Sequence, residues 1–394
     1  MFVGCALADH DNHTNFVQTC AENGFASESY TVISDDGYVY QIYRIPGKAG
    51  DTSTKKPAVL LMHGIECDSN FWTPNTPENV PAFMLAEQGY DVWLGNNRGT
   101  RYGQYHTTMD KSQQEFWRFS QEEMGLKDLP TFIDHILATT GQEKLTYIGH
   151  SQGTTQMFLA ASLNPEYFNS KVNLFVALGP VTSLVNIEVP ALRALSKEWR
   201  EVEYLGIKFG AYDLFNLGYL EETAVQLLCN EVSFVCDDLV RYVADANTEV
   251  DDMDRYDVFL KDFPAGNGYG NLVYYAQSIQ NTEDWLRYDY GIIKNMDVYG
   301  TAVPPAVPID QLSLPTGLFI GSYDKLATVA DNEWLVSQIN ADVLKWHQVY
   351  PLGHLSFTLA KDMTYFREDV MNLVGQYATN SFATDSQETT FLTN

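Results

Sequence analysis

The chain has 394 residues, of which 45% are hydrophobic and 19% charged, and its 24 Lys and Arg against 51 Asp and Glu give a formal net charge of −27. A chain this acidic repels phosphate backbones and anionic lipid head groups, so nucleic-acid binding and electrostatic docking on anionic surfaces are disfavoured. The apolar content argues against disorder and allows one large domain or two to three smaller ones.

The first residues carry features of an exported protein. Ala6-Leu7-Ala8 resembles a signal cleavage site, but no basic region precedes it, so we interpret it as the stub of a truncated signal peptide. Asn12 begins a sequon and is a candidate glycosylation site if the chain is secreted. No apolar run approaches the roughly 20 residues of a membrane span, so the sequence predicts a soluble protein without a transmembrane segment.

An antiparallel hairpin is predicted first, followed by a parallel sheet. Tyr30 to Ser34 and Tyr38 to Arg44 alternate apolar and polar residues around Asp35-Asp36-Gly37, which is typical of a hairpin. After Pro57, short apolar runs alternate with helix-period segments, which indicates an α/β fold whose mostly parallel sheet has helices on both faces. The predicted strands are Ala58 to Met62, Tyr90 to Leu94, Leu145 to Ile148, Leu174 to Leu178, Gly317 to Ile320 and Lys345 to Tyr350.

One interval, between Leu178 and Gly317, is far longer than the roughly 30 residues of a βαβ unit, so about 100 residues are inserted there. We interpret residues 183–310 as a helical cap or lid over the edge where the strands end, with 1–182 and 311–394 as the two parts of the α/β core. An insertion without a role is the alternative. Within the insertion the pattern predicts helices at Glu221 to Leu228 and Asn271 to Ile279, and a solvated acidic face at Asp251, Asp252, Asp254 and Asp257.

The five cysteines are too few for a disulfide scaffold, and their number is odd. Cys229 and Cys236 are the two that lie close in sequence. They are either a short disulfide loop, which an oxidising compartment permits, or two unrelated buried thiols, and the residues alone leave both readings open.

The sharpest local motif is Gly149-His150-Ser151-Gln152-Gly153, which fits G-x-S-x-G. Alone it is weak, because such a match arises by chance in roughly one chain in ten of this length. Its context strengthens it, since the strand Leu145 to Ile148 runs into the motif and Thr154 to Leu163 leaves it as a helix. This strand, elbow and helix arrangement predicts Ser151 as a nucleophile.

A nucleophilic serine needs a base and an acid, which in this fold follow in the order Ser, acid, His. His354 lies in a loop after Pro351 and Gly353, so its ring is free to reach the sheet edge, whereas His347 lies within a strand and is interpreted as half-buried and structural. Asp324 stands just past the strand Gly317 to Ile320 and is the favoured acid. Asp331, seven residues on and expected in a helix, is the lesser candidate.

The oxyanion of the reaction needs two preorganised backbone donors. Gln152 follows the nucleophile at a helix N-terminus and supplies one. The second is expected from His63-Gly64-Ile65 after the strand Ala58 to Met62, with Ile65 as the donor. No cofactor or metal is expected, because the glycines at 95, 99 and 103 fit no nucleotide-binding motif and the His and Asp residues at positions 9–13 lie at a terminus.

From about Asn15 to Tyr377 the chain resembles the acid lipases, the family of gastric and lysosomal lipases that hydrolyse triacylglycerols and cholesteryl esters. The most specific segments are HGIECDSNFW (63–72), GYDVWLGNNRG (89–99), QEFWRFS (114–120), EEMGLKDLP (122–130), YIGHSQGTTQ (147–156), FVALGPV (175–181), GSYDKLA (321–327) and HLSF (354–357). The resemblance implies the α/β-hydrolase fold and a serine lipase that acts through an acyl-enzyme at an emulsion or membrane surface, in a secreted, lysosomal or endosomal location.

Residue by residue, the resemblance implies the roles already assigned to the catalytic and oxyanion residues, and it implies that Cys229 and Cys236 form a cap disulfide. Two departures stand out. Ser356 occupies a position where relatives usually have Asp after His-Leu, and the spacing between the two cap cysteines is slightly shorter than in the family. A hydrolase or acyltransferase of soluble esters is a second reading. A catalytically silent binding protein is a third, disfavoured because every catalytic position is filled.

Overall fold

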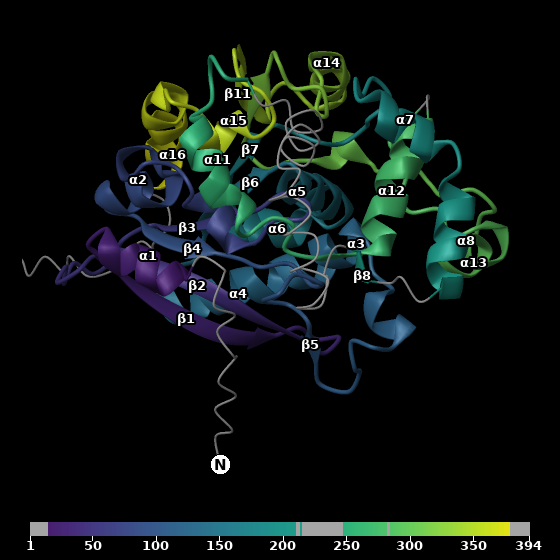
Figure 1. Ribbon diagram of the computed structural model, residues 1–394, viewed down its shortest axis with the longest axis horizontal. Coiled ribbons are helices and arrows are strands. Elements are labelled where there is room, and N and C mark those ends of the chain that lie inside the picture. Colours follow the sequence, from purple (N-terminus) through teal and green to yellow (C-terminus); the bar gives the residue numbers. More distant parts are fainter. Residues whose placement is uncertain (1–14, 210–212, 215–246, 282–283, 379–394) are drawn as a thin grey trace, which may run out of the picture.

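A nine-stranded sheet forms the centre of the protein in the computed structural model, which describes residues 15–209, 213–214, 247–281 and 284–378 (Figure 1). Its strand order is β1-β2-β4-β3-β6-β7-β10-β11, with β5 paired to β2. The first two strands form the predicted hairpin, and from β4 to β11 all neighbours are parallel. The strands are β1 (Phe25–Ile33), β2 (Tyr38–Lys48), β3 (Ala58–Met62), β4 (Asp91–Leu94), β5 (Tyr105–His106), β6 (Leu145–His150), β7 (Val172–Leu178), β10 (Thr316–Gly321) and β11 (Leu344–Tyr350).

The middle strands are buried on both faces, which explains their continuous apolar runs. On β3, Leu60 packs with Tyr147 in one hydrophobic cluster, and its neighbour Leu61 packs with Ile148 in the other. Successive side chains of a strand point to opposite faces, so a strand covered on both sides has to be apolar at every position. The α/β fold with a mostly parallel sheet, predicted from these runs, is confirmed.

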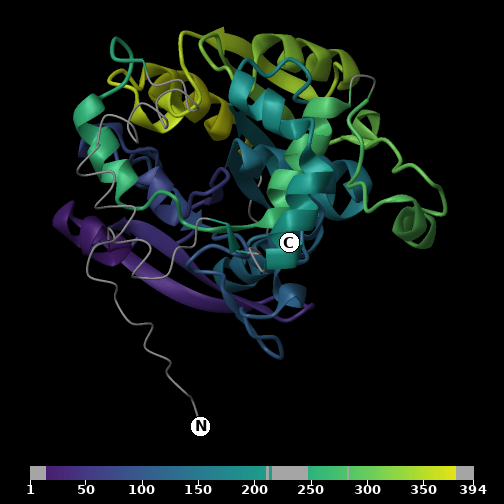
Figure 2. The same ribbon diagram turned by 45° about the vertical axis from the view of Figure 1, so that its right-hand side comes forward.

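Helices from both ends of the chain cover the two faces of the sheet (Figure 2). Side chains of α1, α2 and α16 belong to the cluster that contains Leu61, and those of α4, α5, α6 and α14 belong to the cluster that contains Leu60. The helices of the core are α1 (Phe16–Glu22), α2 (Pro81–Glu87), α3 (Gln121–Glu123), α4 (Leu129–Thr140), α5 (Gln152–Leu163), α6 (Pro165–Lys171), α14 (Val329–Gln338), α15 (Ser356–Leu359) and α16 (Met371–Ala378), with 3-10 turns at Ser69–Trp72, Pro77–Asn79, Gln114–Trp117 and Ile309–Gln311 and π-helical turns at Met124–Asp128 and Tyr365–Val370.

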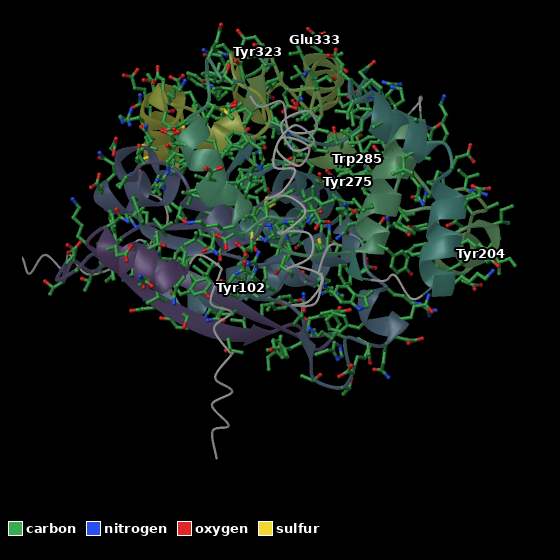
Figure 3. All side chains as sticks on the ribbon, viewed as in Figure 1. Tyr102, Tyr204, Tyr275, Trp285, Tyr323 and Glu333 are labelled. Carbon is green, nitrogen blue, oxygen red and sulfur yellow. The ribbon has the colours of Figure 1, made fainter. Side chains whose placement is uncertain are left out.

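The described residues between β7 and β10 form a mostly helical layer beside the sheet. Its central helix α12, which contains the predicted helix Asn271 to Ile279, packs on α7 and α8. Tyr275 of α12, labelled in Figure 3, places its hydroxyl 3.3 Å from Thr155 Oγ1 of α5. The described elements of this layer are α7 (Pro190–Ser196), α8 (Trp199–Phe209), β8 (Asp213–Leu214), α11 (Met253–Leu260), β9 (Asn267–Gly268), α12 (Tyr269–Gln280) and α13 (Ile292–Tyr299). The predicted helix Glu221 to Leu228 lies outside the described residues, and the cap boundaries at 183 and 310 stay a prediction.

The interpretation of Asp251 as part of a solvated acidic face is wrong. Asp251 is fully buried, and it forms a bridge with Ala360 in the segment that follows α15. Its Oδ2 accepts a hydrogen bond from the Asn247 amide at 2.8 Å. Burial raises the pKa of the Asp251 carboxyl, while hydrogen bonding by Ser356 and Asn247 opposes the rise. The neighbouring Asp254 remains exposed, so the acidic stretch is divided between the interior and solvent.

Candidate active site

Ser151 occupies a strained turn between β6 and α5. Its backbone lies at φ 52° and ψ −116°, a left-handed conformation that costs a non-glycine residue about 1–3 kcal/mol. A Cβ atom on Gly149 would lie 2.7 Å from the Gly153 carbonyl carbon, and one on Gly153 would lie 2.5 Å from the Met62 carbonyl oxygen. Both flanking positions therefore require glycine, and the tight turn lifts the Ser151 side chain to the carboxyl edge of the sheet.

Three side chains from separate strand ends meet at this edge. The Ser151 hydroxyl is 2.8 Å from His354 Nε2, and His354 Nδ1 is 2.7 Å from Asp324 Oδ2. Asp324 follows β10 and His354 follows β11, and each of the three residues is at most 5% exposed. The structure thus brings together the three residues predicted from order and spacing, in a geometry that allows proton transfer from the hydroxyl to the imidazole.

Asp324 is fixed by backbone donors on the side away from His354. Its Oδ1 accepts hydrogen bonds from the amides of Leu326, at 2.9 Å, and Ala327, at 2.7 Å. The alternative acid, Asp331, lies in α14, where it accepts hydrogen bonds from Asn186 and from the Thr328 hydroxyl. These contacts give Asp331 a structural role at the start of α14.

The interpretation of His347 as a half-buried residue is wrong. His347 is exposed, because β11 is the last strand of the sheet order and most of its residues face solvent. An alternating pattern at such an edge need not mark a buried face.

The loop after β3 packs directly against the nucleophile. A Cβ atom on Gly64 would lie 3.1 Å from Ser151 Cβ, so the backbone of this loop reaches within van der Waals contact of the elbow. Among the described residues, neither the Ile65 amide nor the Gln152 amide donates to a backbone oxygen. Both N–H groups therefore remain available to an acceptor beside Ser151.

His63 holds the peptide group that contains the Ile65 amide. His63 Nδ1–H donates to the Gly64 carbonyl at 2.8 Å, and its Nε2 accepts from the Asn97 amide at 3.2 Å. The Gly64 carbonyl and the Ile65 N–H belong to one planar peptide unit, so this bond sets the direction of the N–H. Burial lowers the pKa of His63 to about 4. Sequence reasoning assigned His63 no role of its own, although it begins the motif that supplies the oxyanion loop.

We expect the titration of His63 to lower the free energy of unfolding as the pH becomes acidic. An unfolded histidine titrates near pH 6.5, whereas folded His63 stays neutral down to about pH 4. The neutral ring therefore contributes about 3 kcal/mol to the free energy of unfolding above pH 6.5, and this contribution is lost as the pH falls to 4. His63→Asn keeps a donor near the Nδ1 position and removes the titration. Urea unfolding of both proteins between these pH values should give a flatter profile for the variant. Parallel profiles would contradict a neutral buried His63.

His150, inside the elbow motif, holds the backbone of the predicted base. Its Nε2–H donates to the His354 carbonyl at 2.8 Å, and its ring stacks on Phe71 with centroids 4.6 Å apart. Burial lowers the pKa of His150 well below the usual histidine value, and the neighbouring His354 and His63 lower it further. Sequence reasoning missed this role; the one available signal was a titratable residue at the variable position between Gly149 and Ser151.

Ser356 ties the histidine loop to the segment around Asp251. Its Oγ accepts a hydrogen bond from the Gly353 amide at 2.9 Å and interacts with the buried Asp251 carboxyl. At the position where the resemblance implies Asp, the chain has a hydroxyl, and the carboxyl group of Asp251 lies beside it. Through Ser356, the loop that carries His354 is therefore held both to its own backbone at Gly353 and to the buried Asp251.

Several predicted features lie outside the described residues, namely Asn12, Cys229 and Cys236. Cys20 and Cys67 are buried free thiols. In the part of the chain that the structure describes, no three His, Cys, Asp or Glu side chains form a cluster that could hold a metal ion. None of the described helices is both long and apolar enough to cross a membrane.

The sequence matches two family models, "alpha/beta hydrolase fold" over residues 57–207 and "Partial alpha/beta-hydrolase lipase region" over residues 16–76. Among solved structures, a putative lipase from Sulfolobus solfataricus has a TM-score of 0.57 at 13% identity, covering 90% of this chain and 94% of that chain. A laboratory-evolved variant of a potato epoxide hydrolase has a TM-score of 0.53 at 14% identity, covering 89% and 99%. At these identities the likeness supports the fold alone.

Curated relatives are similar over nearly their whole length. Human lipase member K is 33% identical over 95% of this chain and 94% of its own, and human lysosomal acid lipase/cholesteryl ester hydrolase is 34% identical over 94% and 92%. Mouse gastric triacylglycerol lipase is 33% identical over 86% of each chain. The chain therefore belongs to the acid lipase family, a group of carboxylic ester hydrolases with the α/β-hydrolase fold.

Proposed function

We propose that the protein is a serine lipase that hydrolyses triacylglycerols, cholesteryl esters or both, with Ser151 as nucleophile, His354 as base and Asp324 as acid, in lipid catabolism. The observation that carries the proposal is the chain of hydrogen bonds from Ser151 Oγ through His354 to Asp324 at the end of the strained elbow. A hydroxyl becomes nucleophilic only with such a base in contact, and the base needs an oriented partner.

In the first half-reaction, Ser151 Oγ attacks the ester carbonyl carbon while His354 Nε2 takes the hydroxyl proton. Negative charge develops on the carbonyl oxygen, where the amides of Ile65 and Gln152 would donate to it. Asp324 stabilises the imidazolium and keeps Nδ1 protonated. The intermediate then collapses, His354 gives its proton to the leaving alcohol, and an acyl group stays on Ser151.

In the second half-reaction, His354 removes a proton from water, which attacks the acyl carbonyl. The same two amides hold the second oxyanion, and His354 returns the proton to Ser151 Oγ as the fatty acid leaves. Every proton is carried by His354, so no cofactor or metal is needed for this chemistry.

Aromatic side chains of the proposed cap support a lipid acyl chain as substrate. Phe259 packs on Phe71 with ring centroids 6.3 Å apart, and Phe71 in turn stacks on His150 beside His354. Apolar surroundings of this kind favour binding of a long acyl chain by about 0.8 kcal/mol per buried methylene. Two relatives are named as a triacylglycerol lipase and a cholesteryl ester hydrolase, which suggests neutral lipid esters as substrates, and a secreted, lysosomal or endosomal location accompanies this proposal.

The test is fatty-acid release from emulsified long-chain triacylglycerol and cholesteryl ester between about pH 4 and pH 8, beside a soluble short-chain ester. We expect release from at least one emulsified lipid, and the ratio of the two rates ranks the substrates. Cleavage of the soluble ester alone would contradict the lipid assignment. Absence of hydrolysis with all three substrates would contradict the proposed catalytic site.

A further inference from the structure

Helix α13 buries Asn295 and exposes its isoleucines and methionine, together with the charged Lys294 and Asp297. Asn295 is fully buried, whereas Ile292 is 70% exposed, Ile293 is 83% exposed and Met296 is 51% exposed. A surface helix ordinarily does the opposite, with its apolar stripe against the core. At about 100° per residue these three exposed side chains share one side of the helix, and we call them the α13 patch.

The orientation of α13 is fixed by hydrogen bonds of Asn295. Its Nδ2 donates to Asp289 Oδ1 at 2.7 Å and to the Ala302 carbonyl at 3.1 Å, and its Oδ1 accepts from the Tyr290 amide at 2.9 Å. A buried amide with these partners cannot rotate outward without leaving polar groups unsatisfied. The exposure of the isoleucines is therefore built into the fold.

Exposed apolar side chains are concentrated around this helix. Among the described residues, twelve large hydrophobic side chains are strongly exposed, and five of them fall between positions 292 and 303. Scattered exposed hydrophobics are ordinary, but a concentration on one element marks an interaction surface. Figures 1 and 2 show α13 at the outer edge of the layer formed by the described helices between β7 and β10.

A hollow of about 150 Å³ adjoins α13. Lys294, on the same helix as the α13 patch, lines it together with Tyr269, Tyr288, Tyr290, Glu203 and Arg118. The Lys294 ammonium lies 4.4 Å from the centroid of the Tyr290 ring, and the Tyr288 hydroxyl donates to Glu203 Oε1 at 3.4 Å. Aromatic rings beside the carboxylates of Glu203 and Glu123 suit a quaternary ammonium group, and the two cationic side chains suit a phosphate.

We propose that α13 docks the protein on a zwitterionic lipid surface, with the α13 patch entering the apolar layer and the adjoining hollow receiving a phosphocholine head group. The net charge of −27 disfavours an anionic surface, which leaves apolar insertion and mixed-charge head-group contacts as the source of affinity. The inference rests on the proposed function, because it names the surface on which the ester substrates are met.

Docking is measured with the catalytically inactive Ser151→Ala protein and phosphatidylcholine vesicles, so that hydrolysis does not alter the lipid. Ile293→Asp in this background should weaken vesicle partitioning by on the order of tenfold or more, since it places a charge in the inserted face. Ile33→Asp is the matched control, because Ile33 is 55% exposed on β1, and it should partition as the parent does. Equal losses in both variants, or no loss in either, would overturn the proposal.

Further measurements separate the lipid surface from other occupants. Tighter partitioning to phosphatidylglycerol vesicles than to phosphatidylcholine would contradict a zwitterionic surface. A dimer in sedimentation that Ile293→Asp dissociates, without vesicle binding by the parent, would instead assign the α13 patch to a second copy of the chain. Soluble phosphocholine should bind the parent protein, and Tyr290→Leu should weaken that binding; no binding would overturn the head-group assignment.

The proposed function is tested separately from docking. With Ser151 intact, Ile293→Asp should hydrolyse a soluble short-chain ester at the wild-type rate and an emulsified ester more slowly. If the wild-type protein hydrolyses neither the soluble nor the emulsified ester, the proposed function is contradicted. The docking proposal is then still decided by vesicle partitioning of the inactive Ser151→Ala protein and its Ile293→Asp variant.

Discussion

Ser151→Ala should lower kcat for a soluble ester by on the order of 10⁵-fold, because the acyl-enzyme route then has no nucleophile. Its KM should change little, since the side chain loses one oxygen and the elbow backbone is retained. Steady-state hydrolysis of a chromogenic ester measures both constants. His354→Ala should be similarly slow, and the double variant should be no slower than either single variant, because the two side chains act as one unit.

A serine in the next helix provides the matched control. Ser162 is a buried residue of α5, and its Oγ makes no hydrogen bond among the described residues. Ser162→Ala should therefore retain the wild-type kcat and stability. Activity of Ser151→Ala within about tenfold of the wild type would assign the hydrolysis to another nucleophile.

Asp324→Asn should lower kcat by on the order of 10⁴-fold. An amide in place of the carboxylate cannot stabilise the imidazolium, and it lets His354 adopt the tautomer with a proton on Nε2, which cannot accept the Ser151 proton. The fold should survive, because the side-chain oxygen of Asn can still accept from the Leu326 and Ala327 amides. Steady-state kinetics with circular dichroism measures both properties.

Asp331→Asn distinguishes the two acids that sequence order left open. Asp331 accepts hydrogen bonds from Asn186 and Thr328, so its replacement should cost about 1 kcal/mol of stability and leave kcat within a few fold of the wild type. A larger loss of kcat in Asp331→Asn than in Asp324→Asn would reverse the assignment.

The central strands could be predicted because they are buried on both faces. The run Ala58 to Met62 matches β3 at both ends, and Leu145 to Ile148 falls within β6. Residues placed just after such strands gather at the carboxyl edge of a parallel sheet. For this reason, the G-x-S-x-G motif together with strand order and spacing predicts Ser151, Asp324 and His354 as neighbours, and the structure places them in contact.

Side chains whose surroundings come from distant segments could not be predicted. Asp251 is buried by the segment around Ala360, more than a hundred residues away, and no local pattern signals this. His63 and His150 act through single hydrogen bonds to backbone carbonyls, which leave no periodic trace in the sequence. The exposure of His347 depends on β11 being the edge of the sheet, which is a property of strand order.

The most direct test of the proposed chemistry is covalent labelling with a p-nitrophenyl alkylphosphonate, whose phosphorus resembles the tetrahedral carbon of the reaction. Attack by a serine hydroxyl forms an oxygen–phosphorus bond and releases p-nitrophenolate, which gives a mass increase and a colour together. We expect one adduct per chain, mapped by peptide mass spectrometry to Ser151, and no adduct at the same reagent concentration in His354→Ala. An adduct on another residue, or unchanged labelling without His354, would contradict the assignment of Ser151 and His354 as nucleophile and base.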